Sequence, residues 1–397
     1  ALNKSVESVT WLGNDDSLQP RSRESLDIQT KATLERNAGN INDFANSIRA
    51  MRRHEIERIG LAWMSGVIDD EASLAGMTDV YDAAIEASLQ WAIQHRINDI
   101  QIDEAPAAIA IIGMGRYGGR EVNFSSDADV IIIYRPAEGA DDDQANLFAR
   151  KVQEDLRAIL QGPTTFEPKI ELDMDLRPEG KNGPLVRSYA SCEEYYRSWA
   201  STWEHQALLR ARYAAGDASL AEDFLMNIAD PLRYPKIDLT ETQIAEIRKL
   251  KARMEAERLP RGVRRDRHLK LGKGGLSDVE WTIQLLQLQH AGDNANLRVN
   301  GTLQALNELE HRKLISAGDA VVLRKAWRMC TAARNGSYLW SGRVNQADIL
   351  PDDSYSLGGI AVYLGYDANR GQHFENDLLA VIRKARDVTE RLFYGRS

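Results

Sequence analysis

Apolar residues recur at three- and four-residue spacing over most of the first hundred positions, for example in residues 41–64 and 79–97. This spacing places the apolar side chains on one face of a helix, and it predicts an N-terminal helical segment over residues 1–98. The pattern then changes to two short, continuous apolar runs, residues 107–112 and 130–134, which end near glycine or proline. Runs of this kind are typical of buried strands.

The sequence that follows predicts a small mixed sheet with helical cover, over residues 99–235 as a whole. Three aspartates at 141–143 are expected to cap a helix that ends near residue 160. A third strand is expected over about 165–176. Residues 189–213 keep a helical spacing throughout and predict one long helix.

Beyond Pro235 nearly every segment has a helical pattern, which predicts a C-terminal helical bundle over residues 236–397. Four tryptophans in helical stretches are expected in the core, namely Trp199, Trp203, Trp327 and Trp340. The expected fold class is therefore α+β, with one small sheet between two helical segments.

Charge and composition narrow the classes of function. The chain has 50 lysines and arginines against 59 aspartates and glutamates, a formal net charge of −9, so we expect no nucleic-acid partner. Two distant cysteines, Cys192 and Cys330, cannot build a disulfide framework or a zinc site, and a reducing cytoplasm is the default location. The apolar runs fall well short of the roughly 20 residues that a membrane helix needs, so neither secretion nor membrane insertion is expected.

The most informative stretch runs from Gly113 to Asp129. Gly113, Gly115 and Gly118 follow a predicted strand with the spacing of a dinucleotide-binding fingerprint, whose glycines let the backbone approach a pyrophosphate. That fingerprint also requires a helix directly after the glycines and an acid about 20 residues further on. Residues 123–126 are a poor helix, and two acids arrive early, at the start of the next strand. A Rossmann dehydrogenase is therefore only an alternative.

Asp127 and Asp129 enter that strand two residues apart, so their carboxylates are expected on the same side. Two carboxylates this close favour a cation between them, and oxygen ligands select Mg²⁺ or Mn²⁺. With the glycine turn, and with Ser125 and Ser126 to hold phosphate oxygens, they indicate a site for a nucleoside triphosphate. Asp173, on the predicted third strand, would complete a two-metal site.

Other polar residues near these motifs have simpler interpretations. Asp175 follows Asp173 by two positions, and a strand there would place both on one face. His205 has no partner at metal-ligand spacing and is expected to be structural. Arg210 and Arg212 are within reach of a phosphate in some arrangements, but arginines on helices usually pair with nearby acids.

Lys273 belongs to the main basic run of the chain, residues 259–275. Its glycines precede a predicted helix start at a Ser277-x-x-Glu280 capping box, and backbone N–H groups at a helix start bind anions. We hypothesise that this segment closes over the nucleotide. A flexible, solvated linker is the alternative.

The chain resembles the glutamine synthetase adenylyltransferases, of the nucleotidyltransferase superfamily, in the pattern Gly113-x-Gly-x-x-Gly-Gly-x-Glu-x-x-x-Ser-Ser-Asp-x-Asp129 and in Leu172-Asp-x-x-Leu-Arg-Pro178. The resemblance covers nearly all of the chain beyond about residue 70 and implies a polymerase-β-like catalytic domain. Full-length members carry two such units, one that removes adenylyl groups by phosphorolysis and one that adds them. Only one unit is present here, and residues 202–212 are more similar to the adenylylating unit.

The resemblance also implies roles for individual residues. It assigns metal binding and catalysis to Asp127, Asp129 and Asp173. It assigns the nucleotide phosphates to Gly118, Gly119 and Ser126. Arg177 is a candidate contact for substrate or pyrophosphate, with a salt bridge that fixes the strand to the next loop as the alternative. Asp175 stands where many relatives have an arginine.

The activity implied by the resemblance is transfer of AMP from ATP to a tyrosine hydroxyl of glutamine synthetase, with Mg²⁺ or Mn²⁺ as cofactor and release of pyrophosphate. A PII-type signalling protein is the implied regulatory partner. Three alternatives stay open: phosphorolytic removal of AMP, uridylyl transfer to a small signalling protein, and a non-catalytic module that senses nucleotide or a PII-type protein.

Overall fold

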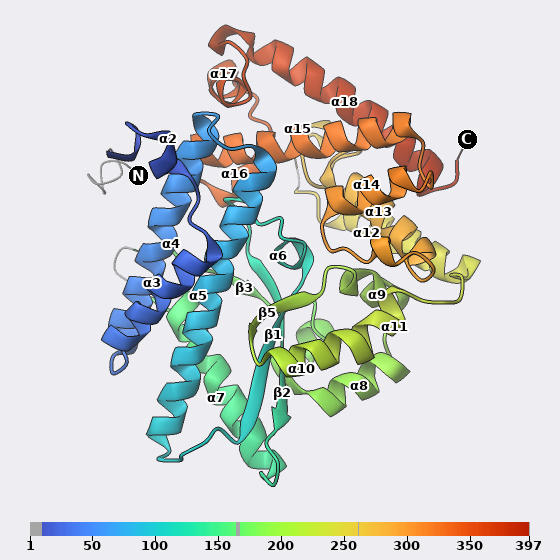
Figure 1. Cartoon of the computed structure of the whole chain (residues 1–397). Coiled ribbons are helices and arrows are strands. Elements are labelled where there is room, and N and C mark those ends of the chain that lie inside the picture. Colours follow the sequence, from blue (N-terminus) through green and yellow to red (C-terminus); the bar gives the residue numbers. More distant parts are fainter. Residues whose placement is uncertain (1–9, 164–166, 261, 397) are drawn as a thin grey trace. The chain divides into compact units, whose positions relative to one another are not determined.

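The chain folds into two compact units, the first ending at Pro231 and the second beginning at Leu232 (Figure 1). The structure is a computed structural model, and it describes residues 10–163, 167–260 and 262–396. Each unit is described by itself.

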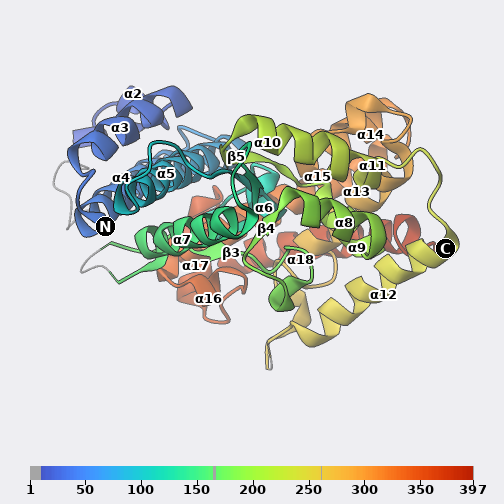
Figure 2. The same cartoon turned by 90° about the horizontal axis from the view of Figure 1, so that it is seen from below.

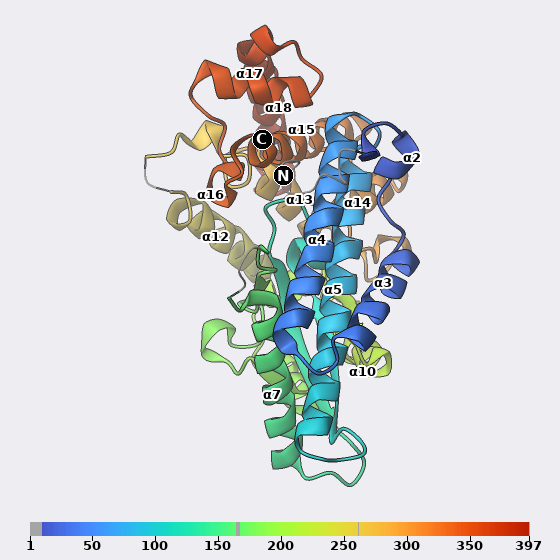
Figure 3. The same ribbon diagram turned by 90° about the vertical axis from the view of Figure 1, so that its left-hand side faces the viewer.

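The first unit opens with a layer of helices whose starts are set by side-chain caps. Asn40 accepts N–H groups at the start of one long helix and Asp69 at the start of the next, at 2.9 and 2.8 Å respectively, as N-cap residues do. The two long helices pack against each other, as Figure 3 shows. These helices are α2 (Asp15–Leu18), α3 (Arg23–Arg36), α4 (Ile41–Met64) and α5 (Asp70–Asp99).

A mixed five-stranded sheet follows, in the order β3-β2-β1-β5, with β4 also paired to β2. The two predicted apolar runs form its centre: β1 and β2 pair antiparallel and are almost wholly buried, because helices cover the sheet. β2 runs parallel to both β3 and β4. The strands are β1 (Ala107–Gly113), β2 (Ala128–Pro136), β3 (Leu172–Asp173), β4 (Val186–Ser188) and β5 (Arg212–Gly216).

Helix α7 is the crossover between β2 and the two strands parallel to it (Figure 2). Its N-cap Asp141 accepts the N–H of Gln144 at 3.0 Å, and its apolar face packs on β1, β2, α4 and α5. The other helices of this part are α6 (Gly115–Gly118), α7 (Asp142–Gln161), α8 (Tyr189–Ser198), α9 (Thr202–Leu208), α10 (Ala218–Asp223), a π-helical turn (Phe224–Ala229) and α11 (Asp230–Arg233).

Two predicted elements of this unit are wrong in extent. The third strand, expected over 165–176, is only β3; residues 164–166 lie outside the described part. Asp173 Oδ1 accepts the N–H of Asp175 at 2.7 Å and turns the chain, and the edge of β2 beyond Asp129 is taken by β4. Asp175 therefore does not continue the strand, and the predicted placement of Asp173 and Asp175 on one face of a strand is wrong.

The single helix expected over 189–213 is divided into α8, α9 and β5. Ser201 begins α9 with a capping box in which Glu204 accepts the N–H of Ser201, and residues 212–216 pair with β1 instead of continuing the helix. Trp199, at the end of α8, is 75% exposed, so its predicted place in the core is wrong.

The second unit is a helical bundle, and the α+β fold with a small mixed sheet and flanking helical segments is confirmed. Trp327 lies buried in it as expected, whereas Trp340, like Trp203 of the first unit, is half-buried. No helix in the described part of the chain is long and apolar enough to cross a membrane. The helices of the second unit are α12 (Glu241–Glu257), α13 (Leu276–His290), α14 (Thr302–His311), α15 (Ala317–Ser341), α16 (Val344–Ala347), α17 (Ser354–Tyr363) and α18 (Gly371–Leu392).

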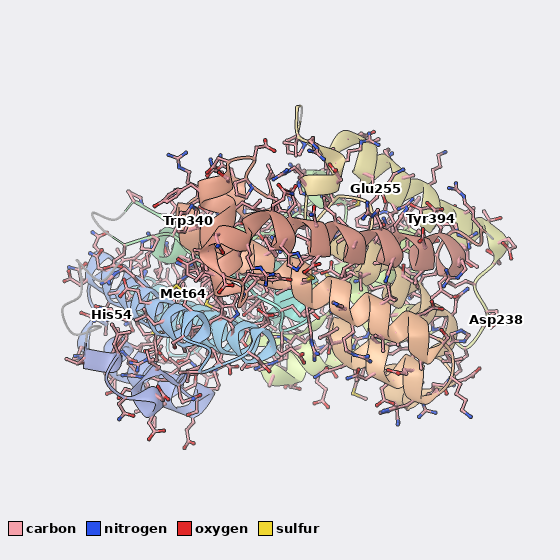
Figure 4. The ribbon with its side chains drawn as sticks, turned by 90° about the horizontal axis from the view of Figure 1, so that it is seen from above. His54, Met64, Asp238, Glu255, Trp340 and Tyr394 are labelled. Carbon is pink, nitrogen blue, oxygen red and sulfur yellow. The ribbon has the colours of Figure 1, made fainter. Side chains whose placement is uncertain are left out.

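A buried ionic cluster joins three helices of this bundle. Asp278 of α13 is ion-paired with Lys251 of α12 and, at 2.9 Å, with Arg386 of α18. Glu255 of α12 and Tyr394, just beyond α18, lie at the same end of the unit (Figure 4). Burial raises the pKa of Asp278, but Lys251 and Arg386 outweigh it, and the pKa lies below its ordinary value.

The same cluster replaces the predicted capping box. Helix α13 begins at Leu276 with Gly275 as its N-cap, and no side chain caps it. Asp278 Oδ2 instead accepts the N–H of Gly274 at 2.6 Å. Ser277 and Glu280 therefore do not form the predicted box.

Candidate active site

The glycine turn between β1 and β2 holds a carboxylate directly against its backbone. Gly115 has φ +51°, and a Cβ built on it would lie 2.1 Å from Asp129 Oδ2. The N–H of Met114 donates to the main-chain oxygen of Asp129 at 2.8 Å. Only glycine fits at position 115, because any side chain would displace the Asp129 carboxylate.

The next two glycines, Gly118 and Gly119, have their N–H groups hydrogen-bonded to carbonyls of the glycine turn. The N–H groups of Gly118 and Gly119 donate to the carbonyls of Met114 and Gly115, at 2.6 and 3.1 Å, inside the short helix α6. Gly118 is buried, and a Cβ there would lie 2.0 Å from the carbonyl oxygen of Arg210. These amides are therefore engaged within α6, and the contacts of Gly118 and Gly119 with nucleotide phosphates stay a prediction.

The three predicted acids come from the same end of two parallel strands. Asp129 of β2 and Asp173 of β3 are direct register partners, on strands about 4.8 Å apart. Asp127 immediately precedes β2, so strand alternation does not fix its side chain on the side of Asp129. The sheet thus brings Asp127 and Asp129 of the D-x-D motif and Asp173 of β3 to one edge.

Two of these acids face a common cavity. Asp127 and Asp173 line a cavity of about 530 Å³, together with Asp175, whose carboxylate lies 3.2 Å from Lys181 Nζ. Among the described residues, no three Asp, Glu, His or Cys side chains lie close enough to form a ready-made metal cluster. The donor set still suits a hard cation, because it is made of carboxylate oxygens on adjacent strands.

The loop that carries Ser125 and Ser126 is held by its own asparagine. Both serine hydroxyls donate to Asn123 Oδ1, at 3.1 and 2.8 Å, and the carbonyl of Ser126 accepts the hydroxyl of Tyr81 at 3.0 Å. Arg52 in turn donates to the Tyr81 oxygen at 2.7 Å. Helices α4 and α5 therefore position the loop through Arg52 and Tyr81. The contact of the two serines with phosphate oxygens stays a prediction.

Arg177 is buried and its donors are used within one loop. It donates to the carbonyls of Met174, Lys181 and Gly183 at distances from 2.7 to 3.3 Å. Its carboxylate neighbour Asp175 is 4.0 Å away. The geometry favours the structural alternative for Arg177 over a substrate contact.

The two arginines near β5 are also paired internally. Arg210 lies 3.4 Å from the Glu121 carboxylate, and Arg212 donates to Asp82 at 2.8 Å and lies over the ring of Tyr117. Sequence analysis did not single out Asp82, although an acid inside the apolar pattern of residues 79–97 is a signal that could have found it.

The side chains of Glu204 and His205 are largely removed from water, and burial shifts the pKa of each. Glu204 accepts the hydroxyl of Tyr195 at 2.9 Å, and burial raises its pKa against the opposing effect of hydrogen bonds from Ser201 and Tyr195. Burial lowers the pKa of His205. Lys273 is exposed and belongs to the second unit, so its part in nucleotide binding stays a prediction.

A glycine turn, a D-x-D pair and an acid on the adjacent parallel strand together define the catalytic domain of a nucleotidyltransferase. Residues 2–227 match the family model described as glutamate-ammonia ligase adenylyltransferase. The chain belongs to this family, which confirms the resemblance found in the sequence. Residues 247–393 match the model described as GlnD PII-uridylyltransferase.

Curated relatives carry one printed name, bifunctional glutamine synthetase adenylyltransferase/adenylyl-removing enzyme. The protein from Bifidobacterium longum (strain NCC 2705) is 77% identical over 397 residues, which cover 100% of this chain and 37% of the relative. That from Leifsonia xyli subsp. xyli is 42% identical over 394 residues, 99% of this chain and 38% of the relative. That from Mycobacterium tuberculosis is 44% identical over 345 residues, 87% of this chain and 34% of the relative. The chain thus spans little more than a third of the length of these relatives.

Proposed function

We propose that the chain transfers AMP from ATP to a tyrosine hydroxyl of glutamine synthetase and releases pyrophosphate. The register pairing of Asp129 with Asp173, beside a glycine turn that only glycine can form, carries the proposal. The printed name of the relatives supports the acceptor and the nucleotide. Mg²⁺ or Mn²⁺, held by Asp127, Asp129 and Asp173, would neutralise charge on the triphosphate.

The chemistry requires one bond to form and one to break. The tyrosine oxygen attacks the α-phosphorus of ATP, and the bond from that phosphorus to the bridging oxygen of pyrophosphate breaks. Asp173, at the mouth of the cavity, accepts the phenolic proton. Asp129, held against the glycine turn, orients the triphosphate side of the site.

Adenylylation is the direction we favour, because residues 202–212 are more similar to the adenylylating unit of the family. The printed name also includes the adenylyl-removing reaction, which uses the same bonds in reverse with phosphate as the attacking group. The match of residues 247–393 to a PII-uridylyltransferase model supports a PII-type protein as a partner of the second unit.

Label transfer tests the proposal. The protein is incubated with Mg²⁺, purified glutamine synthetase and ATP labelled at the α-phosphate, with γ-labelled ATP in parallel. We expect label from the α position only. Asp129→Asn and Asp173→Asn should each reduce transfer by about 100-fold or more, because they remove a charge at the reacting centre.

Asp175→Asn is the matched control for these variants. Asp175 lines the same cavity but lies outside the strand register, so this variant should keep most of the activity. Wild-type protein that converts adenylylated glutamine synthetase and phosphate to unmodified glutamine synthetase and ADP, and transfers no AMP from ATP, would reverse the direction. An active Asp129→Asn variant would remove the assignment of the acids.

A further inference from the structure

A second cavity adjoins the acids and runs along the outer face of helix α7. It has a volume of about 990 Å³ and lies between that helix and residues 181–186. It shares Arg157, Arg177, Lys181 and Leu185 with the cavity that contains Asp127 and Asp173, so the two form one continuous groove. The mechanism above uses only the end of the groove at the acids.

The helical wall of the groove is a single stripe of hydrogen-bond donors. Five side chains share the i, i+4, i+7, i+11, i+15 positions of one helix face: Asn146, Arg150, Gln153, Arg157 and Gln161. Each carries N–H donors, and none is an acid. The opposite wall contributes the apolar side chains of Pro184 and Leu185 and the exposed Lys181.

The cations on this stripe are not neutralised by acids. Arg150 makes no ion pair with any described residue, and Arg157 donates only to Gln161 Oε1, at 3.1 Å. Glu154, the acid nearest to them in the helix, is ion-paired with Lys151 at 2.8 Å, which holds the pKa of Glu154 below its ordinary value. Glu154 also lines the cavity, so the wall along α7 carries one acid against the two arginines Arg150 and Arg157, and the groove is basic on balance there.

One donor that lines the groove, the side-chain N–H group of Gln153, has no acceptor among the described residues. The residue is 5% exposed and lines the cavity, and no acceptor in the described part of the chain lies within hydrogen-bond distance of its Nε2. A buried donor without a partner destabilises the folded state. A ligand that brings an oxygen atom into the groove would satisfy it.

We infer that this groove binds an extended, acidic segment of the acceptor polypeptide beside the tyrosine that is modified. The stripe from Asn146 to Gln161 is about 22 Å long, which fits six or seven residues of extended chain. Arg150 and Arg157 are about 10 Å apart along the helix, which matches acidic side chains three residues apart in a polyproline-II segment, because three residues there make one turn of about 9 Å and bring both side chains to one face. Main-chain carbonyls would accept from Gln153. The inference rests on the proposed function and specifies its acceptor.

Peptide binding to the whole chain, measured without ATP, tests this inference separately from turnover. The probe is a fluorescent tyrosine peptide with two acidic residues three positions apart, compared with the same peptide carrying asparagine at those positions. We expect Arg150→Glu/Arg157→Glu to weaken binding of the acidic peptide about tenfold or more. The asparagine peptide should bind weakly to both proteins.

Lys31→Glu/Arg36→Glu, on the exposed side of α3, makes the same change in net charge away from the groove and should leave binding unchanged. Gln153→Met should raise the melting temperature of the free protein, because it removes an unpaired buried donor, and yet weaken peptide binding. Equal binding of the acidic peptide by wild type and the α7 variant would overturn the inference. Equally strong competition by a single-stranded oligonucleotide would also overturn it.

A kinetic measurement separates this failure from failure of the proposed function. In the label-transfer assay, Arg150→Glu alone, which lies outside the cavity of the acids, should raise the KM for glutamine synthetase and leave the KM for ATP unchanged. If both KM values stay at the wild-type level while transfer proceeds, the groove is not the acceptor site and the function still stands. If wild type transfers no label, the function fails whatever the peptide does.

Discussion

At the scale of single residues, the site depends on one backbone position that excludes a side chain. Gly115 combines a left-handed backbone with an Asp129 carboxylate that occupies the space where a Cβ would lie. Two separate effects of a substitution can therefore be distinguished: backbone strain, and displacement of the acid. Gly139 has the same kind of backbone, at φ +76°, but nothing lies within 4 Å of a Cβ there.

We predict that Gly115→Ala reduces AMP transfer by about 100-fold, because the added methyl group moves the carboxylate away from its working position. The left-handed backbone should add about 1 kcal/mol of destabilisation. Gly139→Ala should show a similar loss of stability and wild-type transfer. Labelled ATP and urea unfolding measure the two effects, and equal activity of both variants would contradict the prediction.

At the scale of elements, the cluster around Asp278 holds the C-terminal bundle together. It links the helices α12, α13 and α18 through charges that are all largely removed from water. A buried ion pair contributes little net stability by itself, but loss of one partner leaves the others uncompensated. Asp278 is the member of this cluster that pairs with both Lys251 and Arg386 from a third helix, so we expect its ionisation to matter for the stability of the bundle.

We predict that the stability of the bundle falls as the solution becomes acidic. The pKa of Asp278 lies below its ordinary value of 3.8 in the folded chain, so its ionisation stabilises the fold above that value. This stabilisation is lost as the pH falls through the folded-state pKa. Asp278→Asn should cost about 3 kcal/mol at neutral pH and remove this part of the acid dependence.

Urea unfolding at a series of pH values measures both effects. Asp266→Asn is the control, because Asp266 also pairs with an arginine, Arg264, but is exposed, and its loss should cost at most about 0.5 kcal/mol. An Asp278→Asn variant with wild-type stability at neutral pH would show that the cluster is not needed.

At the scale of the whole molecule, the chain divides into two compact units, with Gly115 in the first and Asp278 in the second. We predict two calorimetric transitions, with Gly115→Ala lowering one midpoint and Asp278→Asn the other. Residues 232–397 produced alone should retain helical circular dichroism and unfold cooperatively. A single transition that both variants lower equally would contradict this prediction.

Much of this architecture could be predicted from the sequence, and the failures have local causes. The apolar periodicity of α4 and the runs of β1 and β2 were clear, because each satisfies one simple pattern of burial. The single helix expected over 189–213 failed because Ser201 and Glu204 form a capping box that starts a new helix. Helical spacing alone does not show such a break.

Within the candidate site, the pairing of Asp129 with Asp173 could be predicted because both were expected on strands of one sheet, whereas the side of Asp127 could not, because β2 begins only at Ala128. The internal contacts of Gly118 and Arg177 could not be predicted, because each depends on carbonyl groups that only the folded chain brings within reach. The Arg52 and Tyr81 contacts were also hidden, since one joins two helices at positions 29 residues apart and the other joins a helix to a loop 45 residues away.

The hydrogen bond from Tyr81 to the carbonyl of Ser126 has a consequence for how small this catalyst can become. A peptide that contained only the glycine turn and the strands would keep every acid and lose the scaffold that aims them. Helices from the start of the chain thus belong to the smallest part that can work. Removal of α4 and α5 should therefore abolish AMP transfer even where the acids and the glycine turn are kept.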